Sequence, residues 1–268
     1  MGKIGYGYGS EWHLLRYLGY HRTVLDGFVL RATGEKASEA VEEASKVGVH
    51  WLDREFSSTR KPLYDDREFG GVYFNQARHI EVYVVPQWRE YWPASGTPPQ
   101  WDAVARLSTD EQDRGMDPEG EWLLVEAKAH LGEMETQCEA EKPESLAMIG
   151  RALDATAKAV THQGKPTSAW MEKYYQYANR LAVLNFLCQY RSHPGQSARL
   201  IFLYFYGESE EAMPGRKCPQ SADEWQAHID KVNAEMDIDP QSALMQRVHH
   251  IFLPINLRTN PIRTRAQP

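Results

Sequence analysis

The stretch WLLVEAKAHLGE, residues 122–133, places two charges at the end of an apolar run. Glu126 and Lys128 stand one residue apart, directly after the aliphatic residues of this run. Successive side chains on a strand point to opposite faces, so the two charges share a face. The other face receives only apolar side chains, namely Leu123, Val125, Ala127 and Ala129. Burying an unpaired charge costs several kcal/mol, so two charges on a core strand indicate a function.

A second acidic side chain, Asp102, stands near the start of the apolar segment WDAVARL, residues 101–107. The acidic segment 108–121, which contains glycine and proline, separates it from the strand that carries Glu126. A hairpin would therefore bring Asp102 beside Glu126. Two carboxylates held that close repel each other, and one stays protonated unless a cation joins them.

A divalent cation would remove this repulsion. Mg²⁺ prefers oxygen ligands and is typically held by one or two carboxylates together with substrate phosphates. We therefore predict that Asp102 and Glu126 bind Mg²⁺, for which Mn²⁺ is a candidate substitute. The ammonium group of Lys128 beside the ion suits the positioning of an attacking water or the stabilisation of charge on phosphate. These three residues form the predicted catalytic set for metal-assisted phosphodiester hydrolysis.

The segments QWDAVARL and EWLLVEAKAHL, residues 100–107 and 121–131, resemble the motif of the PD-(D/E)XK nuclease superfamily. That motif consists of an acidic residue, a gap, and an acid-x-lysine triplet on the next strand. Trp101 stands where the motif has proline. The resemblance implies a restriction-endonuclease-like αβββαβ core, here within about residues 10–207. We expect a nuclease that acts on DNA in preference to RNA, with RNA left open.

Members of this superfamily often draw a further acid from the first helix. Glu11 is the best-placed candidate for this additional metal ligand, and Glu39 and Glu43 are the alternatives. The helix dipole also favours a carboxylate in the first helical turn, so this simpler explanation of Glu11 stays open.

The acid-x-lysine triplet alone carries little information, because it arises by chance at about one position in 150 at average composition. Its simplest explanation is a surface ion pair at a strand end, which would contribute about 0.5 kcal/mol. The apolar strand and the upstream Asp102 favour the catalytic interpretation. The rival function is a binding or interaction module that keeps the nuclease fold without turnover. Nucleotide hydrolysis finds no support, since the sequence lacks a G-x-x-x-x-G-K-[ST] loop.

The net charge of −7 and the pI of about 5.8 give no global positive field that would attract nucleic acid. Contacts must then come from local groups, from the metal, or from a homodimer that merges two basic faces. The candidate nucleic-acid contacts are His130, Gln176, Arg180, Arg60, Lys61 and Arg89. A solvated surface role is the simpler explanation for the basic residues and for His130.

The rest of the sequence predicts one mixed α/β domain, residues 1–268, with a central sheet flanked by helices. Helices are expected at residues 11–30, 35–48, 143–160, 168–191 and 222–236. Strands are expected at residues 79–86, 101–107, 121–131, 198–207 and 248–257. Residues 222–257 extend the nuclease-like core, and residues 258–268 form a loose basic tail. One helical stripe is expected to be core: Tyr174, Tyr177, Leu181, Leu184 and Cys188.

The three cysteines, Cys138, Cys188 and Cys218, are far apart and form no C-x-x-C pair. This pattern suits a reducing compartment and gives little support to a structural zinc site. The longest apolar run, LIFLYFY at residues 200–206, is too short to span a bilayer. We therefore expect a cytoplasmic protein without a membrane partner.

Overall fold

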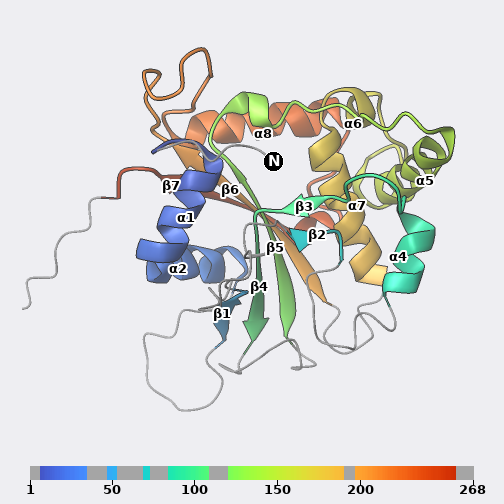
Figure 1. Cartoon of the computed structure of the whole chain (residues 1–268), viewed down its shortest axis with the longest axis horizontal. Coiled ribbons are helices and arrows are strands. Elements are labelled where there is room, and N and C mark those ends of the chain that lie inside the picture. The colour runs from blue at the N-terminus through green and yellow to red at the C-terminus, as the bar shows by residue number, and fades with distance from the viewer. Residues whose placement is uncertain are drawn as a thin grey trace, which may run out of the picture.

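The computed structural model describes residues 7–34, 47–52, 69–72, 84–108, 120–189 and 197–257. These residues form an α/β structure in which helices flank a mixed five-stranded sheet (Figure 1). The strands follow the order β1-β4-β5-β6-β7 across the sheet. Their bounds are Gly48–Trp51 for β1, Ala103–Ser108 for β4, Glu121–Lys128 for β5, Ala198–Tyr206 for β6 and Val248–Pro254 for β7. A small second sheet pairs β2 (Phe69–Gly70) with β3 (Gln100–Trp101).

Strand β4 runs antiparallel to both of its neighbours, whereas β5, β6 and β7 run parallel to one another. Parallel neighbours need a crossover connection, and helices supply it on both occasions. The carboxyl ends of β5, β6 and β7 consequently meet at one edge of the sheet. The segments that follow these strands are therefore gathered at that edge.

The helices form two groups, one on each face of the sheet (Figure 1). Their bounds are Ser10–Tyr20 for α1, Arg22–Ala32 for α2, Val85–Tyr91 for α4, Pro143–Val160 for α5, Ala169–Glu172 for α6, Tyr175–Gln189 for α7 and Ala222–Glu235 for α8. Helices α1 and α2 cover one face, and α5, α7 and α8 cover the other. Both faces of the central strands are therefore buried.

Strand β5 contributes to both cores by simple alternation. Leu123, Val125 and Ala127 pack with the apolar side chains of α1 and α2, as the sequence predicted. Trp122 and Leu124 point to the opposite face and pack with α5, α7 and α8. Glu126 follows Leu124 on that second face, so its carboxylate is directed into a helix-covered core and away from open solvent.

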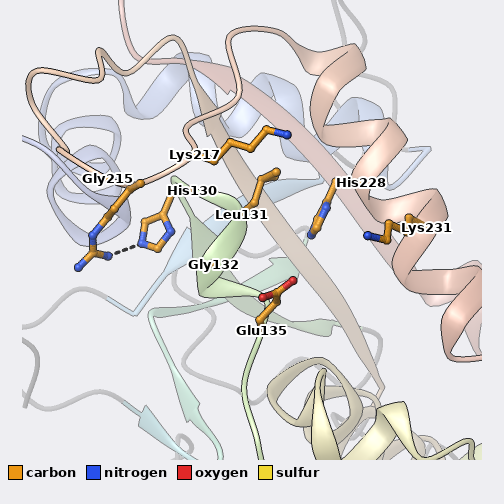
Figure 2. Close-up of a pocket in the computed structure, with 9 residues that line it drawn as sticks. His130, Leu131, Gly132, Glu135, Gly215, Lys217, His228 and Lys231 are labelled. Atoms are coloured by element: carbon orange, nitrogen blue, oxygen red, sulfur yellow. Dashed lines mark hydrogen bonds between the residues drawn. The ribbon is translucent and has the colours of Figure 1, made fainter.

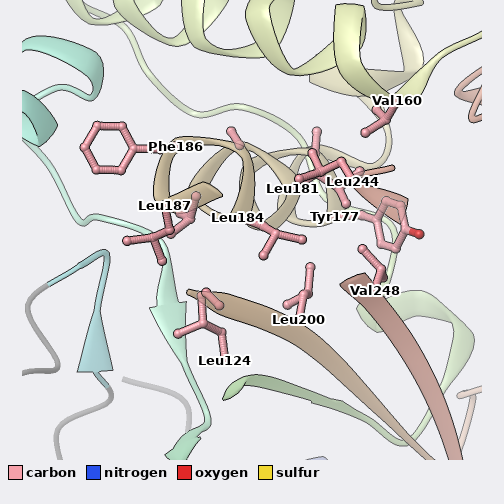
Figure 3. Close-up of a cluster of buried hydrophobic side chains, with 14 of the residues drawn as sticks. Leu124, Val160, Tyr177, Leu181, Leu184, Phe186, Leu187, Leu200, Leu244 and Val248 are labelled. Atoms are coloured by element: carbon pink, nitrogen blue, oxygen red, sulfur yellow. The ribbon is translucent and has the colours of Figure 1, made fainter. Parts of the chain in front are cut away.

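Helix α7 is largely buried, and every residue of 177–187 is buried. Figure 3 shows its leucines above Leu124 of β5 and Leu200 of β6. The predicted core stripe is confirmed for four residues and only in part for Cys188, which is half-buried. Arginine is rarely buried unless its charge is paired, so the burial of Arg180 on α7 requires a partner.

Two of the predicted helices are divided in the structure. The predicted helix 11–30 is broken at His21, which separates α1 from α2. The predicted helix 168–191 is broken at residues 173–174, where Lys173 ends α6 before α7 begins. The break between α6 and α7 is fixed by Thr136, whose backbone pairs with the chain on both sides of it. Helical spacing carried no signal for these breaks, since apolar residues continue through both.

The expected strand at residues 79–86 is wrong where the structure describes it, because Val85–Tyr91 form helix α4. Pro86 lies in the first turn of this helix, where its missing N–H costs nothing, and does not end a strand. Trp88 and Trp92 stack one helical turn apart with ring centroids separated by 5.7 Å. This packing outweighs the β propensity of the valine-rich sequence.

The predicted helix 35–48 falls mainly outside the described residues, and its last residue, Gly48, begins β1. The expected helix 143–160 is confirmed. The segment 222–257 adds α8 to the core and β7 to the sheet beside β6. Within the described ranges, no helix combines the length and apolar character needed to cross a bilayer.

Candidate active site

Asp102 occupies the one-residue interval between β3 and β4. The register of β4 on β5 pairs Ala103 with Val125, so Asp102 stands across from Glu126. Two backbone contacts fix this position. The N–H of Asp102 donates to the carbonyl of Val125 at 3.1 Å, and the N–H of Ala127 donates to Asp102 Oδ2 at 2.6 Å. The predicted approach of Asp102 to Glu126 is thereby confirmed.

Glu126 and Lys128 form a buried ion pair near the end of β5. The ammonium group of Lys128 donates to Oε1 of Glu126. The two residues are only 2% and 7% exposed, respectively. The alternative of a solvated surface pair is therefore wrong. A buried pair costs desolvation energy and needs further hydrogen bonds to be stable.

Arg180 of α7 supplies these further hydrogen bonds. Its Nε and Nη2 atoms lie 2.8 and 2.7 Å from Oε2 of Glu126. Its Nη1 donates to Oδ1 of Asn179 at 2.8 Å, and the guanidinium lies over the ring of Trp101, 5.0 Å from the centroid. Both oxygens of Glu126 thus face a cation, one from the strand and one from the helix.

The acids of this cluster have opposite electrostatic environments. Burial raises the pKa of Asp102 to about 8, and the negative charge of Glu126 adds to this rise. Burial also opposes ionisation of Glu126, but Arg180 and Lys128 together hold the pKa of Glu126 below its ordinary value. In the absence of a bound cation, the cluster therefore holds Asp102 largely protonated and Glu126 ionised at neutral pH.

A cavity of about 360 Å³ opens beside Asp102 and Arg180. Its walls come from the segment before β4, the segment after β5 and the start of α7. The polar side chains that line it are Thr97, Gln100, Thr136, Gln137, Glu139, Gln176 and Asn179. Trp92 and Tyr175 add aromatic surface. Such a lining offers donors, acceptors and stacking faces to a ligand that reaches the cluster.

The site offers two carboxylates to a metal. Oxygen donors from Asp102 and Glu126 fit Mg²⁺, which also takes ligands from water and substrate phosphate. Burial, and then the negative charge of Glu126, raise the pKa of Asp102, so a cation bound beside this carboxyl would favour its ionised form. Across the described ranges, no group of three or more His, Cys, Asp or Glu side chains is arranged to hold a metal ion.

Glu11, the candidate for an additional ligand, lies in the first turn of α1. Glu11 belongs to α1, which packs on the face of the sheet opposite to the side chain of Glu126. Glu133, a third acid near the end of β5, has both carboxylate oxygens in hydrogen bonds. Its Oε2 accepts from the N–H of Ala129 at 2.5 Å, and its Oε1 accepts from the hydroxyl of Ser10 at 3.1 Å. The assignment of Glu11 as an additional metal ligand therefore stays a prediction. Glu39 and Glu43 lie outside the described residues.

The remaining predicted contacts are dispersed. Gln176 lines the cavity, and its backbone N–H donates to Thr136 Oγ1 at 2.7 Å. His130 accepts a hydrogen bond from Arg216 at a different pocket. Arg89 lies exposed on α4 and lines neither pocket. Arg60 and Lys61 lie outside the described residues.

His249 and His250 are adjacent on β7, so their side chains point to opposite faces of the sheet. The His250 ring stacks on Phe202 with centroids 5.6 Å apart. Burial lowers the pKa of both histidines to about 4. Both rings are therefore neutral structural groups at physiological pH.

Comparison of the chain with protein-family models, with curated proteins and with solved structures gives no match.

Proposed function

We propose that the chain is a metal-dependent nuclease that hydrolyses phosphodiester bonds, with DNA as the preferred substrate. The observation that carries the proposal is the position of Asp102 across from Glu126, with Lys128 on the same strand. Burial and then the charge of Glu126 raise the pKa of Asp102, and a divalent cation bound there would lower it. Asp102 and Glu126 are far apart in the sequence, so the pairing of β4 with β5, and not the local sequence, brings the two acids together.

The element order supports a restriction-endonuclease-like core. Among the described elements, the N-terminal helices precede β1, β4 and β5, and α5–α7 then lead to β6. This succession matches an αβββαβ arrangement around a mixed sheet. The small β2–β3 sheet and α4 are additions between β1 and β4.

Each residue of the cluster has a distinct role in this proposal. Asp102 and Glu126 would hold Mg²⁺, which would polarise the phosphate and lower the pKa of an attacking water. Lys128 orients that water or stabilises charge that develops on the phosphate oxygens. Arg180 neutralises Glu126 in the metal-free protein and also lines the cavity, where its guanidinium can donate to a phosphate.

The cavity beside Asp102 supports a nucleotide ligand. Amide side chains such as Gln137, Gln176 and Asn179 present paired donors and acceptors, which is the chemistry of base edges. Trp92 and Tyr175 offer faces on which a base could stack.

A cleavage assay with supercoiled DNA, single-stranded DNA and RNA tests the proposal. Wild-type protein with Mg²⁺ or Mn²⁺ should cleave DNA, and EDTA should abolish cleavage. The Lys128→Gln variant should lose at least about 100-fold in rate, as expected when a group that stabilises transition-state charge is removed. The matched control is Lys158→Gln, which removes an exposed lysine on α5 and should leave the rate unchanged. Equal rates for the two variants would refute the role of Lys128.

One observation favours the rival function, a non-catalytic module with the same fold. Lys128 and Arg180 already pair with both oxygens of Glu126, so the negative charge of Glu126 is neutralised without a metal. In that case the cluster would serve to anchor α7 on β5. Binding of Mg²⁺ or Mn²⁺ distinguishes the two functions, since only the nuclease needs a cation at Asp102.

A further inference from the structure

A second pocket lies at the edge of the sheet where the parallel strands end. It has a volume of about 570 Å³ and lies between the end of β5, the segment after β6 and helix α8 (Figure 2). The charged and titratable side chains in its wall are His130, Glu135, Arg216, Lys217, His228 and Lys231. The proposed catalytic cluster uses none of these residues.

The pocket carries an excess of positive charge. Three cations face one acid, Glu135, so the net charge is positive even with both histidines neutral. In Figure 2 the ammonium groups of Lys217 and Lys231 point from opposite walls towards the region around His228. The whole chain has a net charge of −7, so this concentration of cations opposes the overall trend.

The described contacts compensate this charge only weakly. Lys231 has an ion pair with Glu235 at the long distance of 3.8 Å, and the Lys231 side chain is 60% exposed. Arg216 donates to Nε2 of His130, and the nearest acid to that ring is Glu133, whose Oε1 lies 3.5 Å from the same nitrogen. Nε2 of His228 is buried without a hydrogen-bond partner among the described residues. An anion in the pocket would relieve the repulsion.

Backbone contacts hold the pocket walls in place. The N–H of Leu131 donates to the carbonyl of Lys217 at 3.0 Å, which attaches the segment after β6 to the end of β5. The N–H of Gly207 donates to the carbonyl of Pro219 at 2.9 Å, which closes the same segment on itself. Gly215 has a φ of 74°, a conformation that glycine adopts without strain. These contacts fix the backbone from which the pocket's cations project.

The pocket adjoins the candidate active site through one continuous segment. Glu135 lines this pocket, and the next residue, Thr136, lines the cavity beside Asp102. His130 follows Lys128 by two residues, a distance of about 6.6 Å along extended chain. This spacing is comparable to the separation of adjacent phosphates in a nucleic-acid strand.

We propose that this pocket binds a backbone phosphate of a DNA strand, close to the phosphate held at Asp102 and Glu126. The claim that this phosphate lies near the cleaved bond rests on the proposed nuclease function. The claim that the pocket binds a phosphate does not. The pocket makes the substrate a strand of several nucleotides, because a mononucleotide reaches only one of the two sites.

Fluorescence anisotropy in EDTA tests the inference without cleavage. The probe is a labelled single-stranded DNA of about 12 nucleotides, within the usual site sizes of single-strand grooves. The double variant Lys217→Gln/Lys231→Gln should weaken binding roughly 20-fold at about 0.1 M salt. It should also reduce the slope of log K against log salt by about 0.7, the value for one phosphate contact on a single strand. The single variant Lys158→Gln, outside the pocket, should change neither value.

A variant that is expected to tighten DNA binding separates the effect of charge from the effect of unfolding. Glu135→Gln removes the one acid from the pocket wall and should tighten DNA binding, whereas general damage to the fold would weaken it. Unchanged affinity in the double variant, weaker binding by Glu135→Gln, or no DNA binding by wild type would overturn the inference. DNA binding that depends on these lysines, together with no cleavage in Mg²⁺, would refute the nuclease function and leave the phosphate pocket intact.

Discussion

Arg180 Nε lies 2.8 Å from Oε2 of Glu126, although 54 positions of sequence separate the two residues. This contact joins helix α7 to strand β5 within the core on this face of the sheet. It also places a cation beside the acids that we propose as metal ligands. The same interaction therefore affects both the stability of the fold and the charge of the site.

Substitution of Arg180 by Gln should lower the free energy of unfolding by about 3 kcal/mol, the lower end for removal of one partner of a buried pair. The loss stays at this lower end because Lys128 still faces Glu126. Chemical denaturation measures the change. The control is Arg151→Gln on the exposed side of α5, which should cost less than about 0.5 kcal/mol. Equal losses in both variants would show that Arg180 contributes no more than a surface arginine.

The stability of the metal-free protein should depend on pH through Asp102. Its pKa in the folded state is raised to about 8, mainly by burial, so the folded protein keeps a proton that the unfolded chain releases near pH 4. This contribution to stability is fully present below about pH 4 and is lost as the pH rises through about 8. Its slope is at most about 1.4 kcal/mol per pH unit.

The variant Asp102→Asn should lack this contribution, because its amide cannot ionise. Its advantage in unfolding free energy over wild type should grow between about pH 5 and pH 8 in EDTA. Asp154→Asn, at an exposed position on α5, provides the control for a general charge effect. Parallel stability curves for wild type and Asp102→Asn would mean that Asp102 is ionised in the folded protein throughout this range.

Thr136 connects the candidate active site to the start of α7. Its hydroxyl accepts a hydrogen bond from the N–H of Gln176 at 2.7 Å. Thr136→Val keeps the side-chain shape and removes the acceptor, so it should cost about 1 kcal/mol of unfolding free energy. Thr97→Val in the same cavity changes an exposed threonine and should have a smaller effect on thermal unfolding. A larger loss of stability in Thr97→Val than in Thr136→Val would exclude a stabilising role for the Thr136 hydroxyl at the start of α7.

The sequence was informative where the determining pattern is local. Alternation along β5 separates Leu123 and Val125 from Glu126, and this prediction is confirmed. The acidic segment before β5 indicated a hairpin, and the β4–β5 register confirms that Asp102 comes opposite Glu126. The lengths of α5 and α8 also follow from their amphipathic patterns.

Other features depended on contacts that no local pattern encodes. Arg180 was predicted as a phosphate contact, whereas its partner in the structure is Glu126. The available signal was three polar residues, Asn179, Arg180 and Asn185, within a helix that is otherwise mostly apolar. The basic pocket was missed because Arg216 and Lys231 come from a loop and from α8, which meet His130 only in the folded chain.

Titration of the full-length chain with Mn²⁺ in a calorimeter, for wild type and Asp102→Asn at the same pH, tests the central claim most directly. We expect one divalent-cation site per chain in wild type and its loss in Asp102→Asn, since the amide oxygen is a much weaker ligand than a carboxylate. Identical binding by the two proteins, or no binding by a folded wild type, would contradict the assignment of Asp102 and Glu126 as a metal site.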